Sequence, residues 1–465
     1  MKSRVLTLAT LFVATQLTGC AVFRSYDSEL KETNQYLSTG NVDAALAVLE
    51  KNNTSEEKDL LYWFEKGELL RSKGDLAGSQ TAWRAADGIV FKWEEAVRLD
   101  SEKYLSQFGS YLVNDKIRRY EGYDYEKVML TTQMALNLLA QNDFDGARTE
   151  IKKTHEREAL IAELRDKEYL KREEQADKEG VKTAYKDLKG YPVATLDAPE
   201  VISLKNSYQS AFSHYLSGYV YEALGEKGLA APGYRTAAEL LPNTPLLEQA
   251  LLDLDKTGEK DKQKDSDVLI VVQSGLAPAR SSMSSALPLM ISGNLVITTL
   301  SFPVIQEDTS TAAIGQITLD NKALGLTTLN STSIMSRRAL RDDMPGIILR
   351  TTVRAVTRGM AQKKLNETNP TAGLILGLAA IITEGADTRT WRTLPNQTLV
   401  GRVRLSQGEH QLNLPSGLGG NKVAVTIDRP YQVVALRVIG NQIYATGQAA
   451  HVVTPPSAAA VASLK

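Results

Sequence analysis

The chain has 465 residues, with 54 basic and 55 acidic side chains and a formal net charge of −1. This length predicts two or three domains, and the balanced charge argues against a broad nucleic-acid-binding surface. Because Cys20 is the only cysteine, a framework of disulfide bonds within the chain is excluded.

The first segment has the layout of an export signal. Lys2 and Arg4 form a basic start, and a mostly apolar run from Leu6 to Leu17 follows, too short to span a bilayer as a mature helix. The run ends in Leu17-Thr18-Gly19-Cys20, which resembles a lipobox, where the cysteine is acylated before the signal is removed. We therefore expect residues 1–19 to be a lipoprotein signal peptide and Cys20 to carry fatty-acyl chains such as palmitate. The alternative is a plain signal peptide or a buried apolar helix.

The residue that follows the cysteine predicts the destination of the protein. Two or three acyl chains make a firm anchor, because each buried methylene contributes about 0.8 kcal/mol. In lipoproteins of Gram-negative bacteria, Asp after the cysteine tends to retain the protein at the inner membrane, and this chain has Ala21 instead. We therefore expect the protein at the outer membrane, mainly facing the periplasm.

Residues 20–254 are predicted to form tetratricopeptide-like helical repeats. In one unit, Gly67 allows two helices to approach closely, Gly74-Asp75 forms the turn between them, and the aromatic residues fill the groove. The repeat signature positions of the two clearest units are Trp63, Gly67, Gly74 and Trp83, and then Gly218, Tyr221, Gly225, Tyr234 and Pro242. The alternative is a generic antiparallel helical bundle.

Two weaker units complete the predicted array. One has its turn at Gly40-Asn41 and the other at Asn142-Asp143, so the turns at Gly40 and Gly74 are 34 residues apart. Residues 92–125 match the pattern poorly and are interpreted as a divergent helical pair. The charged stretch from His155 to Lys189 predicts a long protruding helix or a hairpin arm, with a solvated face of an ordinary helix as the alternative. The loop from Lys189 to Pro199 could line the concave face.

The second half changes character. Residues 255–266 are highly charged and predict a linker, residues 267–450 a β-rich α+β domain, and residues 451–465 a tail. A helical hairpin, Pro345 to Lys364 and Thr371 to Glu384, is expected to interrupt the strands. The predicted strands are 268–272, 295–299, 314–319, 399–405, 411–414, 423–427, 432–438 and 442–446. The fold class is thus multidomain, α followed by α+β.

An arginine cluster on the predicted hairpin is the candidate binding site. Arg350, Arg354 and Arg358 are spaced by four, so they line one helix face. Arg389 and Arg392 bracket Trp391 further along. Arginines beside an aromatic ring suit anionic glycans, lipid headgroups or carboxylates on a partner. The alternative is a structural network with neighbouring carboxylates, namely Asp342, Asp343, Glu384 and Asp387.

Several local motifs resemble those of a family of proteobacterial lipoproteins with a tetratricopeptide-like N-terminal half. They are Glu121–Lys127 (EGYDYEK), Tyr215–Ala223 (YLSGYVYEA), Ser274–Pro278 (SGLAP) and Ala386–Pro395 (ADTRTWRTLP). The resemblance covers most of the mature chain. It implies an outer-membrane lipoprotein associated with the cell envelope, and it implies no particular chemistry.

No motif for catalysis or for a cofactor was found in the sequence. The four histidines do not fall at metal-ligand spacing, and phosphate-binding loops, dinucleotide fingerprints and nucleophile elbows are missing. We therefore expect no cofactor, no metal and no enzyme activity. The leading hypothesis is a membrane-anchored scaffold that binds protein partners in envelope biogenesis, such as peptidoglycan synthesis. The alternatives are a glycan- or lipid-binding lipoprotein that contacts peptidoglycan or lipopolysaccharide, and a cryptic carboxylate-dependent hydrolase.

Overall fold

The computed structural model describes residues 26–108, 119–255, 265–291, 294–306, 308, 311–368, 385–415, 422–447 and 449–453. The predicted signal peptide, Cys20, most of the predicted linker, the apolar run from Thr371 to Thr383 and most of the predicted tail lie outside these residues. Across the described ranges, no helix is long and apolar enough to cross a membrane.

The first half is built from helical hairpins with similar turns. In each turn a residue with positive φ ends the first helix: Gly40 at +87°, Gly74 at +88°, Asn142 at +61° and Gly225 at +76°. In three of the turns, Asn41, Asp75 or Asp143 then caps the second helix by accepting a backbone N–H. The hairpins are α2 (Tyr26–Ser38) with α3 (Val42–Asn52), α4 (Leu60–Lys73) with α5 (Leu76–Leu99), α7 (Asp124–Leu139) with α8 (Phe144–Glu179), and α11 (Ala211–Ala223) with α12 (Lys227–Leu240). The predicted repeat turns are confirmed.

Two helices are longer than the sequence pattern indicated. Helix α5 has 24 residues and is followed by the short α6 (Ser101–Phe108), so the expected divergent pair is instead the end of α5 and one short helix. Helix α8 has 36 residues, which corresponds to about 54 Å, and it contains most of the charged stretch predicted as a long helix. Helix α13 (Pro245–Asp255) ends the helical half.

The segment after α8 packs elsewhere than predicted. Residues 185–202 form the short helices η1 (Tyr185–Asp187), α9 (Val193–Leu196) and α10 (Pro199–Ile202). Tyr191 donates a hydrogen bond to the carbonyl of Pro303 at 2.8 Å, and Leu196 shares an apolar cluster with Phe302 and Leu340. The segment therefore covers β3 (Asn294–Ile305) and α15 (Thr332–Thr368) of the second half, and the prediction that it lines the concave face is wrong.

The second half contains two five-stranded sheets that pack face to face. The strands of the first sheet, in spatial order, are β11 (Gln442–Ala445), β10 (Tyr431–Ile439), β1 (Ser266–Ser274), β7 (Gln397–Leu405) and β6 (Thr327–Ser331). Those of the second are β12 (Ala450–Val453), β9 (Lys422–Ile427), β8 (Gly408–Asn413), β4 (Gln316–Leu319) and β5 (Lys322–Gly325). The eight predicted strands are confirmed, with shifted ends.

Strand β1 is buried on both of its faces. Val268, Ile270 and Val272 point into the core between the two sheets. Leu269 and Val271 point the other way and pack on α7 and α11. Because successive strand residues face opposite sides, this central strand needs a continuous apolar run rather than an alternating one. The helical hairpins thus pack on the outer face of the first sheet.

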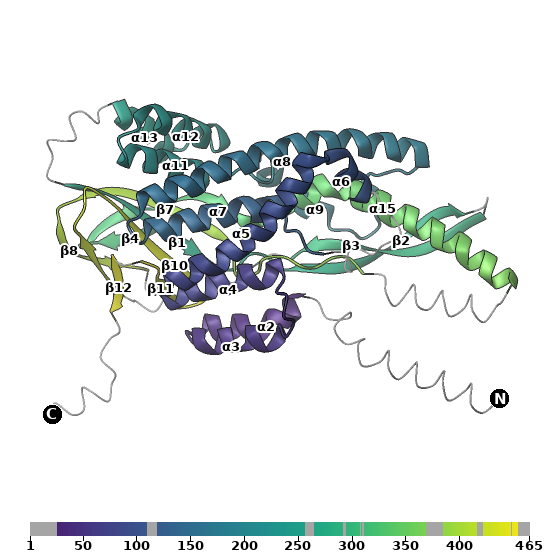
Figure 1. The fold of residues 1–465 in the computed structure, drawn as a ribbon, viewed down its shortest axis with the longest axis horizontal. Coiled ribbons are helices and arrows are strands. Elements are labelled where there is room, and N and C mark those ends of the chain that lie inside the picture. Colours follow the sequence, from purple (N-terminus) through teal and green to yellow (C-terminus); the bar gives the residue numbers. More distant parts are fainter. Residues whose placement is uncertain are drawn as a thin grey trace.

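Three long elements extend away from the sheets and form an arm (Figure 1). The arm consists of the far part of α8, the hairpin of β2 (Arg280–Ile291) and β3 (Asn294–Ile305), and α15 (Thr332–Thr368). Strands β2, β5, β6 and β12 were not predicted, and β12 includes residues 451–453, which were expected to belong to the tail. Helix α15 begins 13 residues before Pro345, so this proline lies inside the helix and not near its start as expected. The second helix of the predicted hairpin falls outside the described residues.

Candidate functional site

The repeat signature residues hold the helical hairpins together. A Cβ on Gly67 would lie 2.2 Å from Nε1 of Trp83, and one on Gly218 would lie 2.5 Å from the ring of Tyr234. Only glycine permits these close approaches. Tyr221 is buried, Trp63 is half-buried, and Pro242 lies in the turn between α12 and α13. The helical half is therefore tetratricopeptide-like in its contacts as well as its turns.

The helices that face the sheet hold a segment of the same chain, residues 390–393. Glu65 of α4 accepts the backbone N–H of Arg392 at 2.8 Å and that of Thr393 at 3.0 Å. Glu126 of α7 accepts the backbone N–H of Trp391 at 2.7 Å. The two carboxyl groups, each fully buried, thus bind consecutive peptide groups as a clamp. We call Glu65 and Glu126 the carboxylate clamp.

Burial controls the protonation of the carboxylate clamp. It raises the pKa of the Glu65 carboxyl to about 7, although hydrogen bonds from Thr393 and Arg392 act to lower it. It raises the pKa of Glu126 to about 7 as well, against hydrogen bonds from Tyr120, Trp391 and Thr390. Both carboxyl groups therefore titrate near neutral pH.

A second buried contact joins α4 to β10. Arg437 is fully buried, and its Nε donates to Glu68 at 2.8 Å while Nη2 donates to the carbonyl of Thr393 at 3.1 Å. Arg71 lies beside them and donates to Gln273 of β1 at 2.6 Å. These contacts join residues from opposite halves of the chain, so the inner face of α4 is occupied by the protein itself.

The structure separates the members of the predicted arginine cluster. Trp391 is 0% exposed and stacks on Phe64 with ring centroids 4.3 Å apart, so it is a core residue and the expectation that it contacts a ligand is corrected. Nε of Arg392 pairs with Asp27 at 2.6 Å. Arg358 lies half-buried on α15, away from the cavity described next. The sequence Arg389-Thr-Trp391-Arg392 does not indicate which of these side chains points into the core.

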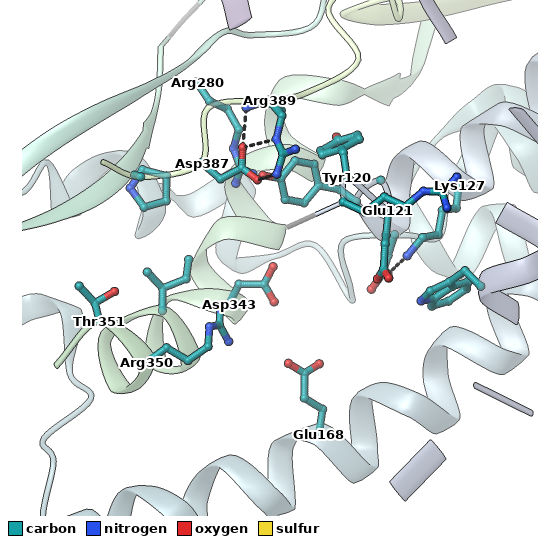
Figure 2. Close-up of a pocket in the computed structure, with 18 of the residues that line it drawn as sticks. Tyr120, Glu121, Lys127, Glu168, Arg280, Asp343, Arg350, Thr351, Asp387 and Arg389 are labelled. Atoms are coloured by element: carbon teal, nitrogen blue, oxygen red, sulfur yellow. Dashed lines mark hydrogen bonds and ion pairs between the residues drawn. The ribbon is translucent and has the colours of Figure 1, made fainter. Parts of the chain in front are cut away.

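The three remaining arginines, Arg350, Arg354 and Arg389, line one cavity of about 290 Å³. Its walls come from α5, α6, α7, α8, β2, β3, α15 and the segments 119–123 and 385–389. Figure 2 shows Arg389 beside Asp387 on one side and Arg350 beside Asp343 on another. The cavity lies where the helical array meets the arm, and it is the candidate site.

The carboxylates that line the cavity are already bound to cations or to a hydroxyl group. Arg165 contacts three of them: Asp124 at 2.6 Å, and Glu168 and Asp343 at 2.8 Å each. Asp387 pairs with Arg389 at 2.7 Å, and Glu121 accepts the hydroxyl of Tyr104 at 2.6 Å. For Asp124, burial raises the pKa, but Arg165 and Lys127 outweigh it and leave the pKa below its ordinary value.

Arg280 is a buried cation of the cavity that forms no ion pair with a carboxylate among the described residues. It is 3% exposed, its guanidinium lies over the ring of Tyr123 at 3.9 Å, and its Nε has no hydrogen-bond partner among the described residues. Burial lowers the pKa of Arg280, while Tyr120, Asp343 and Asp387 oppose this lowering through space. Arg280 was not among the site residues predicted from the sequence. The signal it carried was its place two residues after the SGLAP motif, at the start of a strand that lacked a clear pattern.

The part of the chain described here contains no group of three or more His, Asp or Glu residues that could hold a metal ion. Around the cavity, the side chains offer ion pairs, hydrogen bonds and aromatic faces. The arrangement is suited to binding.

Comparisons with known proteins add little to this picture. No protein-family model and no curated protein matches the chain. One solved structure with similarity is the TPR2AB domain of yeast Sti1 in complex with pHSP90: it is 14% identical, the match covers 50% of this chain and 84% of that one, and the TM-score is 0.20. Another is a tetratricopeptide repeat protein from Parabacteroides merdae, 14% identical over 50% of this chain and 98% of that one, with a TM-score of 0.13. With such low scores, the description of the repeats rests on the contacts given above.

Proposed function

We propose that the protein is a lipid-anchored adaptor of the bacterial outer membrane, which faces the periplasm and binds protein partners of cell-envelope biogenesis. The lipobox at Cys20, Ala21 after it and the tetratricopeptide-like helices support this proposal. Tyr26, the first residue of α2, comes six positions after Cys20, so an acylated Cys20 would hold α2 within roughly 20 Å of the membrane.

The arm is the observation that carries the proposal. Helical repeats commonly bind partners on their inner face, but here the clamp of Glu65 and Glu126 and the first sheet occupy that face. The arm extends beyond the sheets, and α8 presents Tyr169 and Leu170 there, 54% and 66% exposed. We therefore place the partner on the arm.

A binding role is preferred to catalysis because of the state of the cavity carboxylates. A hydrolase with two catalytic carboxyl groups needs one that holds a proton and one that is a free base or nucleophile. In the cavity, Asp124, Glu168 and Asp343 share Arg165, and Asp387 is held by Arg389. These ion pairs occupy the carboxylates, and those to Asp124 also hold the pKa of its carboxyl below the ordinary value.

The test is photocrosslinking in cells. A photoreactive amino acid replaces Leu170 on the arm in one strain, and Leu229 on α12, which is 51% exposed, in the matched control. The proposal predicts a crosslinked protein in the envelope fraction at position 170 and none at position 229. Equal yields at both positions, or no adduct at position 170, would contradict it.

A further inference from the structure

The cavity between the helical array and the arm has the size and the lining of a small-molecule site. Its volume of about 290 Å³ lies just below the range of about 300–1,000 Å³ that is typical of such sites, so it suits a small ligand. Aromatic and apolar side chains form much of its wall, among them Trp93, Tyr104, Tyr123 and Ile347. A ligand that fills it would bury an apolar or aromatic body against these rings.

Arg280 supplies a charge inside this cavity that the protein does not neutralise by direct contact. The residue is nine-tenths or more buried, and its Nε lacks a hydrogen-bond partner within the described ranges. Burying a cation without such a partner is costly, because the site must replace the water that the charge has lost. Stacking on the ring of Tyr123 offsets only part of this cost.

The neighbouring cations show the contrast. Arg165 contacts three carboxylates, and Lys127 pairs with Asp124 at 3.5 Å while it lies over the ring of Trp93 at 3.6 Å. For Arg280, the facing carboxylates Asp343 and Asp387 act only through space. They remain bound to Arg165 and Arg389 instead. The buried guanidinium is therefore oriented by its ring contact and lacks its own anion.

We propose that this cavity binds a small organic anion, a carboxylate or a phosphate ester that carries an apolar or aromatic body, and that Arg280 pairs with its oxygen atoms. The anion accepts hydrogen bonds from the guanidinium and balances its charge, because the planar N–H donors of arginine match carboxylate and phosphate oxygens. The aromatic rings cover the body. The site does not depend on the adaptor proposal, because it uses the cavity and not the exposed surface of the arm.

Binding is measured by calorimetry and by thermal shift on the full mature chain carrying Cys20→Ala, so that no lipid interferes. The probes are phenyl phosphate and benzoate, with inorganic phosphate and benzylammonium as comparisons. We expect phenyl phosphate or benzoate to bind and to raise the melting temperature. Arg280→Gln should weaken this binding by about 10- to 100-fold, the value of a hydrogen bond to a charged group. Arg429→Gln, a matched change at an exposed arginine, should leave it unchanged.

The stability of the variants separates binding from folding. Without ligand, Arg280→Gln and Arg280→Met should melt no lower than the parent chain, because they remove an incompletely paired buried charge. A large drop in melting temperature for both would show that Arg280 is structural and would overturn the proposal. Equal affinity of phenyl phosphate and benzoate for the parent and Arg280→Gln, or tighter binding of benzylammonium or inorganic phosphate, would overturn it as well.

The source of the anion is distinguished with vesicles. Phosphatidylcholine vesicles are prepared with and without phosphatidic acid, and the Cys20→Ala chain is sedimented with each. Sedimentation that requires phosphatidic acid and is lost in Arg280→Gln assigns the anion to a lipid headgroup. Binding of phenyl phosphate without such sedimentation assigns it to a soluble molecule. If neither phenyl phosphate nor the vesicles bind, the proposed anion site is contradicted. The crosslinking result at Leu170 would not be affected by that outcome.

Discussion

Replacing one member of the carboxylate clamp should change how stability depends on pH. The buried carboxyl group of Glu65 accepts hydrogen bonds from two backbone N–H groups and from the hydroxyl of Thr393. The variant Glu65→Gln keeps the shape of the side chain but cannot ionise. The difference in unfolding free energy between the parent chain and this variant therefore isolates the titration of one carboxyl group.

The magnitude follows from the pKa of Glu65, which burial raises from the ordinary value of 4.5 to about 7. Because the folded-state pKa lies above the unfolded one, the contribution of Glu65 is fully present below pH 4.5 and is lost as the pH rises to about 7. Each pKa unit corresponds to about 1.4 kcal/mol, so the parent chain should lose about 3 kcal/mol relative to Glu65→Gln across this window.

The assay is urea unfolding of both proteins at several pH values from 4.5 to 8. Glu50 of α3 provides the control, since partial burial raises its pKa but hydrogen bonds from Lys66 and Tyr62 outweigh burial and lower it. Glu50→Gln should thus give a small dependence of the opposite sign, with the parent gaining relative stability as the pH rises through its titration. Parallel pH curves for the parent and Glu65→Gln would refute the reasoning.

Three further predictions concern the packing and the anchor. Arg437→Ala removes the guanidinium that donates to the buried carboxylate of Glu68. This loss should lower the free energy of unfolding by about 3–5 kcal/mol, measured by urea denaturation. Gly67→Ala forces a Cβ against the indole ring of Trp83 and should destabilise the protein by about 1–3 kcal/mol or more. Gly88→Ala, in open space on α5, is the control and should stabilise it by about 0.5–1 kcal/mol. Similar melting temperatures for the two variants would contradict the repeat contact. Cys20→Ala should move the protein from the membrane to the soluble periplasmic fraction and abolish labelling with palmitate, and retention at the membrane would contradict acylation.

Local sequence signals were sufficient for most individual elements. The turn residues Gly40, Gly74 and Gly225 carried the need for positive φ, and capping Asn or Asp residues followed three of the turns. The continuous apolar run at the start of the second half predicted a buried strand, and the structure shows that both of its faces are covered. Strand β2 was missed because Ser and Met replace the β-branched residues that mark a strand, and its pairing with β3 depends on residues distant in sequence.

The candidate site was predictable only in part, because some of its residues are positioned by contacts between the two halves of the chain. The spacing of Arg350 and Arg354 placed them on one helix face, and both do line the cavity. Arg280 and Trp391 depend on how the two halves of the chain pack together. Trp391 turned inward because its own backbone N–H and that of Arg392 are bound by carboxylates on α7 and α4. Contacts over more than 250 residues of sequence leave no local periodicity to detect.

The central claim is that the helical array is completed by the chain's own second half, which fills its inner face. Hydrogen exchange of α7 and α11 tests this claim most directly, in the full mature chain and in a chain that ends at Asp255. We predict strong protection of both helices in the full chain and rapid exchange in the shortened one, because their buried faces would lose the first sheet and the segment held by the carboxylate clamp. Equal protection in the two proteins would show that the array folds by itself and would contradict the account.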